Sequence, residues 1–202
     1  GTDADTEASG EDTLGAGEDT ETSADTDSGE AAEDSEEEEE EEPVSGSYEI
    51  GGTTEDWTLS EYFRGNVYQA EEDATLDAFE VYLALEESCQ LDFYVHVRDG
   101  EDEDWEVVLA DSISASSGTG YYHSGDIGVS LEEGLHYGLG VGWTCDLTYF
   151  ADADGWYGYD VGFGTFFENY WDNDYLEFSE DYLPANLGSG NTAYAQILHL
   201  TL

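Results

Sequence analysis

Apolar and polar side chains alternate along most of the chain after Pro43. In residues 90–98 the alternate positions hold Leu91, Phe93, Val95 and Val97. A period of two places successive side chains on opposite faces of a β-strand, whereas a helix needs a period near 3.6. We therefore predict a half-buried antiparallel strand here.

The same spacing recurs several times. Its apolar members are Phe79, Val81, Leu83 and Leu85; Trp105, Val107 and Leu109; Leu135, Tyr137, Leu139, Val141 and Trp143; and Leu198, Leu200 and Leu202. Turn-forming sequences rich in Gly, Ser and Asp separate these runs, and no segment carries a sustained helical stripe. This pattern predicts an all-β fold, an antiparallel β-sandwich of jelly-roll type, with a closed barrel as the alternative.

The composition changes abruptly at Pro43. Residues 1–42 hold 20 of the 52 acidic residues and no aromatic residue, and they end in an unbroken run of glutamates. Such a segment cannot bury enough apolar surface to offset the backbone entropy lost on folding. We predict a disordered acidic tether over residues 1–43 and a single domain over residues 44–202.

The charge balance excludes two classes of partner. The 202 residues include 52 acids and only two bases, Arg64 and Arg98, so there is no basic face for nucleic acid or for an anionic membrane surface. No stretch reaches the roughly 20 apolar residues of a spanning helix. The domain itself carries 32 acids and both arginines, a net charge of 2 − 32 = −30. We expect cations to relieve the resulting self-repulsion.

Cys89 and Cys145 are the only cysteines. Both lie in strand-like surroundings, without CxxC spacing or a neighbouring base, which favours a disulfide over two buried thiols. A disulfide predicts an oxidising, extracytoplasmic compartment. An acidic low-complexity segment followed by one β-domain also resembles mature bacterial surface lipoproteins and secreted proteins, which implies secretion or attachment to the cell surface.

Aromatic residues are concentrated in residues 156–182, which hold eleven of the 28 in the chain. Asp, Glu and Asn are interspersed among them, a combination that can hold sugar rings or anchor a protein interface. The predicted ligand-binding residues are Trp156, Tyr157, Tyr159, Trp171 and Tyr175. A neighbouring pattern, Gly138, Gly140 and Gly142 on one strand face, predicts either a trough filled by large aromatics or the floor of a ligand groove.

Three carboxylates beside a glycine turn form a candidate calcium site. Asp152 and Asp154 alternate before Gly155, and Asp160 follows six residues later. Oxygen-rich turns of this kind suit a hard cation, although the EF-hand spacing is absent. Diffuse acidity without a discrete site is the alternative.

Evidence for catalysis is confined to one short stretch. Residues 164–171, which include Glu168, resemble part of the small secreted xylanases, and the resemblance implies a catalytic glutamate pair. No serine or cysteine nucleophile motif and no zinc spacing is present.

These features support three hypotheses of function. The first is a non-catalytic extracytoplasmic binding or adhesion module that contacts a glycan or a surface protein and is stabilised by calcium. The second is a structural subunit of a surface layer, filament or mineral-associated matrix that self-associates with cations. The third is a secreted glycoside hydrolase.

Overall fold

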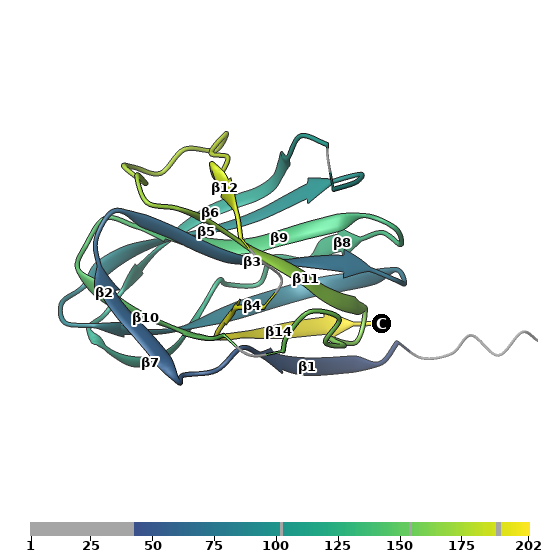
Figure 1. Cartoon of the computed structure of the whole chain (residues 1–202), viewed down its shortest axis with the longest axis horizontal. Helices are drawn as coiled ribbons and strands as arrows, with labels where there is room; N and C mark the ends of the chain where they lie inside the picture. Colours follow the sequence, from purple (N-terminus) through teal and green to yellow (C-terminus); the bar gives the residue numbers. More distant parts are fainter. Residues whose placement is uncertain (1–42, 102, 154, 189–190) are drawn as a thin grey trace, which may run out of the picture. The chain divides into compact units, whose positions relative to one another are not determined.

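The computed structural model describes residues 43–101, 103–153, 155–188 and 191–202. Of the predicted tether, residues 1–42 lie outside the described residues and only Pro43 is described. Contacts divide the chain into two units, residues 1–40 and residues 41–202. The second unit consists of two antiparallel sheets packed against each other. Figure 1 shows them as two layers, with β5, β6 and β9 in one and β1 and β14 in the other. The predicted antiparallel β-sandwich is confirmed, and the two separate sheets rule out the closed barrel.

One sheet has six strands in the described residues. Their order is β12 (Asn186–Leu187), β11 (Gly164–Asp172), β3 (Tyr62–Ala70), β9 (His136–Trp143), β5 (Cys89–Arg98) and β6 (Glu106–Ala115). All neighbouring pairs are antiparallel.

The other sheet has eight strands in the same described residues. Its main path is β1 (Ser45–Ile50), β14 (Gln196–Thr201), β4 (Ala74–Leu85), β10 (Leu147–Asp152) and β13 (Ala193–Tyr194). Off this path, β2 (Glu55–Leu59) pairs with β10, while β7 (Gly118–His123) and β8 (Val129–Leu131) pair with β4. The register of β2 and β10 places Trp57 opposite Tyr149.

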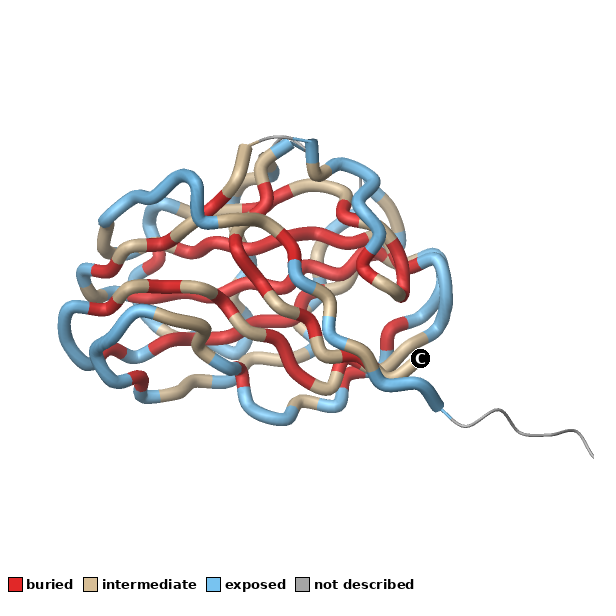
Figure 2. Tube along the Cα trace, turned by 90° about the horizontal axis from the view of Figure 1, so that it is seen from below, coloured by how far each residue is buried: buried red, intermediate tan, exposed pale blue. Residues whose placement is uncertain are grey.

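The main core lies between the two sheets. Phe93 of β5 and Phe79 of β4 are fully buried, with ring centroids 5.3 Å apart in an edge-to-face contact. The apolar faces predicted for β4, β5, β9 and β14 all contribute to this core. In Figure 2 the buried stretches run along the strands, and much of the exposed chain lies in the connections. Burial of each large side chain stabilises the fold by about 1.5 to 3 kcal/mol.

The prediction that Trp105, Val107 and Leu109 share one face is wrong, because a β-bulge interrupts β6. Leu109 pairs with Val95, but Val107 pairs with His96, so the register shifts at Val108. Because a bulge inserts one extra residue, alternate side chains before the bulge point to the opposite face from those after it. Trp105 therefore packs on the outer face of the six-stranded sheet, against Tyr170 and His96, and does not share the face of Leu109.

Large aromatics fill the glycine trough on this outer face. A methyl group at Gly138 would lie 2.8 Å from the Tyr170 ring, and one at Gly142 would collide with Tyr175. Phe63 lies against Gly140 in the same way. The first of the two alternatives for this strand is therefore confirmed: the glycines allow a second layer of rings to approach the sheet.

His96 is buried inside this outer layer. Its Nε2 lies 2.8 Å from the Tyr182 carbonyl, which can only accept, so Nε2–H donates there and Nδ1 accepts from the Tyr170 hydroxyl at 3.1 Å. Burial lowers the pKa of His96 to about 4, and the bond to the Tyr182 carbonyl acts in the opposite direction. The neutral imidazole is thus the form that the fold holds.

A disulfide joins Cys89, the first residue of β5, to Cys145 in the connection between β9 and β10. The predicted pair is confirmed. It links a strand of the six-stranded sheet to the segment that crosses to the eight-stranded sheet, and it closes a loop with a sequence separation of 56 residues. In the chain-entropy model a loop of this length contributes roughly 4 kcal/mol of stability.

We predict that the double variant Cys89→Ser and Cys145→Ser melts roughly 10 °C below the wild type, because the unfolded chain regains the entropy of the open loop. Thermal unfolding followed by circular dichroism measures this difference. Reduction of the wild type should lower its midpoint to that of the variant, and an unchanged midpoint in both cases would contradict the prediction.

We also predict that His96 makes the domain less stable in mild acid. Its pKa is near 6.5 in the unfolded chain and about 4 in the fold. The unfolded state therefore takes up a proton first as the pH falls through this window. The free energy of unfolding should decrease by up to about 1.4 kcal/mol per pH unit. Urea titrations from pH 7 to pH 4 should show a shallower decrease for His96→Gln, and parallel curves for the two proteins would refute this role.

Candidate functional site

The five predicted ligand-binding residues separate into three places. Trp156, Tyr157 and Tyr159 lie in the connection between β10 and β11, where Tyr157 is 65% exposed and Trp156 packs edge-on against Tyr159. Tyr175 is fully buried, its ring over Gly142 and its hydroxyl 2.7 Å from Asp92. Trp171, near the end of β11, lines a pocket together with residues that the sequence analysis did not select.

This pocket, here called the Arg64 pocket, has a volume of about 380 Å³. Its size is within the range of about 300 to 1,000 Å³ that is usual for small-ligand sites. Aromatic, amide and carboxylate side chains line it together with Arg64. The lining residues are Glu55, Trp57, Arg64, Tyr149, Asn169, Trp171, Asn173, Gly188, Thr192 and Tyr194.

The aromatic part of the lining is held by strand pairing and ring stacking. Trp57 stacks on Tyr149, its partner across β2 and β10, with ring centroids 5.3 Å apart. Tyr194 meets Tyr149 edge-on at 5.8 Å. Trp57 keeps 38% of its surface exposed, so its ring packs on Tyr149 and remains partly accessible to solvent.

Arg64 of β3 is nearly buried in the pocket lining, with 7% of its surface exposed. Its Nη1 donates to the carbonyls of Phe63 and Asp172 at 2.7 and 2.8 Å. Its Nη2 donates to Asn173 Oδ1 at 2.9 Å and to the Tyr149 hydroxyl at 3.4 Å. These bonds tie β3 to the end of β11 and to β10 of the other sheet.

Aromatic faces complete the surroundings of Arg64. Its guanidinium carbon lies 4.4 Å from the Tyr62 ring centroid, 4.9 Å from that of Tyr149 and 5.8 Å from that of Trp171. Cation–π contacts of this kind stabilise a desolvated cation by about 0.5 to 2 kcal/mol each. They also fix the rings of Tyr149 and Trp171 in the pocket wall.

No carboxylate among the described residues forms a salt bridge with Arg64. Within those residues the ion pairs join Arg98 to Glu168 and His199 to Glu80. The carboxylate of Asp172 accepts instead from the Tyr182 hydroxyl and the Asp174 amide. Arg64 is therefore a buried cation that is hydrogen-bonded by neutral groups, in a domain with a large excess of acids.

One amide side chain of the lining is also held by a backbone carbonyl. Asn169 Nδ2 donates to the Thr192 carbonyl at 2.8 Å. Glu55 at the start of β2 is exposed. Burial raises the pKa of the Tyr194 phenol, and the positive charge of Arg64 opposes that shift. Arg64 is thus close enough to Tyr194 for its charge to favour the ionised phenol.

Glu168, the residue suggested by the xylanase resemblance, lies elsewhere. It pairs with Arg98 at 2.9 Å on the outer face of the six-stranded sheet. Burial raises the pKa of its carboxyl group, and the Arg98 charge acts in the opposite direction. Arg98 in turn lies 4.4 Å from the Trp105 ring centroid and lines a second pocket with Leu183 and Leu187. Glu168 is thus a partner of Arg98 and does not line the Arg64 pocket.

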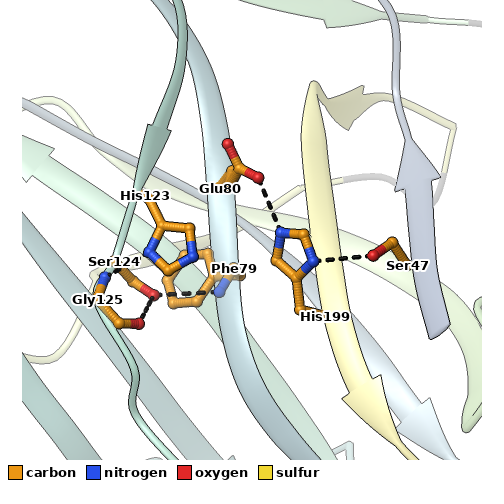
Figure 3. A network of polar contacts seen from close by, with 7 residues as sticks. All are labelled: Ser47, Phe79, Glu80, His123, Ser124, Gly125 and His199. Atoms are coloured by element: carbon orange, nitrogen blue, oxygen red, sulfur yellow. Dashed lines mark hydrogen bonds and ion pairs between the residues drawn. The ribbon is translucent and has the colours of Figure 1, made fainter. Parts of the chain in front are cut away.

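A polar network crosses the outer face of the eight-stranded sheet. Figure 3 shows His199 between Ser47 and Glu80, with its Nδ1 2.9 Å from Ser47 Oγ and its Nε2 2.8 Å from Glu80 Oε1. The His123 ring lies 5.7 Å from that of His199, and its Nδ1 accepts from the Gly125 amide. The contacts of His199 join β1, β14 and β4 across the sheet.

The described residues include only two of the three predicted calcium ligands. Asp154 lies outside the described residues. Asp160 Oδ1 accepts from the Gly162 amide at 2.8 Å, and Asp152 ends β10 opposite Ala193. No group of three or more His, Cys, Asp or Glu side chains in the described residues is arranged to hold a metal ion.

Sequence reasoning missed Trp57 and Arg64. Trp57 lies in a short acidic stretch outside the aromatic-rich segment, and its distance from Trp171 in sequence concealed their shared pocket. Arg64 carried a usable signal, since it is one of two bases in the chain and follows directly on Tyr62 and Phe63.

In the described part of the chain, no helix has the length and apolar character needed to cross a membrane. No known family model matches the chain, and none of the curated proteins has a similar sequence.

Proposed function

We propose that this domain is a non-catalytic binding module that holds a saccharide in the Arg64 pocket. The observation that carries the proposal is the pairing of exposed Trp57, backed by Tyr149, with Trp171 in one concave site. Flat aromatic faces pack against the C–H faces of sugar rings, and fixed polar groups at the rim accept or donate to their hydroxyls.

The other lining residues suit the same ligand. Asn169, Asn173 and Thr192 offer amide and hydroxyl groups at the rim, and Glu55 offers a carboxylate. Among the described lining residues Glu55 is the one acid, whereas glycoside hydrolysis generally uses a pair of carboxyl groups across the scissile bond. This supports binding without hydrolysis.

The proposed setting is outside the cytosol, on a secreted or surface-attached protein. The Cys89–Cys145 disulfide is compatible with an oxidising compartment. Residues 1–42 are acidic and poor in apolar residues, which suits a solvated spacer between an attachment point and the binding domain.

We predict that Trp57→Ala and Trp171→Ala each weaken saccharide binding at least tenfold, because each removes one aromatic plate of the pocket. Isothermal titration against a panel of plant and microbial oligosaccharides measures this loss. Trp156→Ala is the matched control, since Trp156 lies outside the pocket lining. Binding that survives both pocket variants and is lost in Trp156→Ala would move the site to the connection between β10 and β11.

We further propose that bound cations stabilise the domain, as its net charge of −30 requires screening. Either a discrete calcium site or general screening by salt could provide this stabilisation. Thermal melts of the full chain in calcium, in sodium at matched ionic strength and in chelator distinguish the two. A discrete calcium site predicts a rise of several degrees in calcium alone. An equal rise in sodium would instead show general screening.

A further inference from the structure

We infer that the Arg64 pocket selects an acidic saccharide, one whose sugar residues carry carboxylate groups, as in uronic acids. This inference rests on the proposed function and names the class of ligand. It follows from the state of Arg64, which is the one positively charged group among the described residues that line the pocket.

The first step is that no carboxylate among the described residues pairs with Arg64. A buried charge is normally paired, because removal from water is costly and a nearby opposite charge offsets that cost. The chain has acids in great excess, and its other arginine is paired with Glu168 at 2.9 Å. Arg64 has no such partner among the described residues and is held by carbonyl, amide and hydroxyl oxygens. A ligand carboxylate would supply the missing charge.

The second step excludes cationic ligands. Clusters of Trp and Tyr rings often bind organic cations through their faces. Here the guanidinium of Arg64 already lies over Tyr149 and near Trp171, at 4.9 and 5.8 Å from their centroids. A second cation in the pocket would be repelled by Arg64 and would compete for the same rings.

The third step is access to the guanidinium. Arg64 lines the pocket although it is nearly buried, so part of it faces the cavity. Its longest hydrogen bond, 3.4 Å to the Tyr149 hydroxyl, is the weakest of the four. A carboxylate could replace that bond with a shorter, charge-assisted one. The Tyr149 hydroxyl accepts in that bond and keeps its own proton, which it could donate to the ligand.

The fourth step is the contrast between the pocket and the rest of the surface. The domain as a whole repels anions at low salt, since its net charge is −30. At or above physiological ionic strength this repulsion is screened beyond about 8 Å, whereas a buried contact with Arg64 is screened much less. The pocket can therefore recognise an acidic sugar that the remaining surface does not attract.

The test compares acids with their esters. Oligosaccharides of galacturonate, glucuronate and mannuronate, and the methyl esters of each, are titrated into the full-length protein at constant salt. The ester keeps the sugar rings and removes the charge. At least one acid should bind ten times more tightly than its ester. In Arg64→Gln this ratio should fall to near one, and Arg64→Lys should retain part of it. Trp171→Ala should weaken acid and ester together.

The outcomes separate this inference from the proposed function. Equal binding of acids and esters by the wild type overturns the choice of an acidic ligand and leaves saccharide binding in place. Failure of every acid, ester and neutral oligosaccharide to bind overturns both. Because the comparison of acid with ester is made on the wild type, it decides the question even if Arg64→Gln fails to fold.

Discussion

The buried guanidinium of Arg64 is the interaction on which the rest of the site depends. It joins β3 to the end of β11 and, through Tyr149, to the other sheet. A charge in this position is costly, and the carbonyl oxygens and aromatic faces around it offset that cost. The same contacts fix the rings of Tyr149 and Trp171, so the group that stabilises this edge of the sandwich also shapes the pocket.

The aromatic residues have two separate structural roles. On the outer face of the six-stranded sheet, rings such as Tyr170 and Tyr175 pack into the space left by glycines and form a second small core. At the end of β11 the ring of Trp171 instead borders open space. The high aromatic content of residues 156–182 thus reflects both an unusual packing layer and one side of the Arg64 pocket.

The sequence predicted most of the fold and only part of the site. Alternation in β5 and β9 was enough to identify strands and the faces that enter the main core. The half-buried strand predicted for residues 90–98 is wrong, because the opposite face of β5, with Tyr94 and His96, is buried under the outer layer of rings. The bulge at Val108 left no such trace, and it moved Trp105 to the other face. Trp57 and Trp171 lie far apart in the chain, and only the pairing of β2 with β10 brings Trp57 to the pocket. A composition-based choice of aromatics could not separate Trp171 from buried Tyr175.

The most direct test of the proposed binding site uses the five tryptophans as probes. Each indole N–H gives one signal in a proton–nitrogen correlation spectrum, and single substitutions assign the five signals. Addition of a saturating oligosaccharide should shift the signals of Trp57 and Trp171 and leave that of Trp143 in the core unchanged. Shifts confined to Trp156 or Trp105, with Trp57 and Trp171 unmoved, would contradict the assignment of the Arg64 pocket as the binding site.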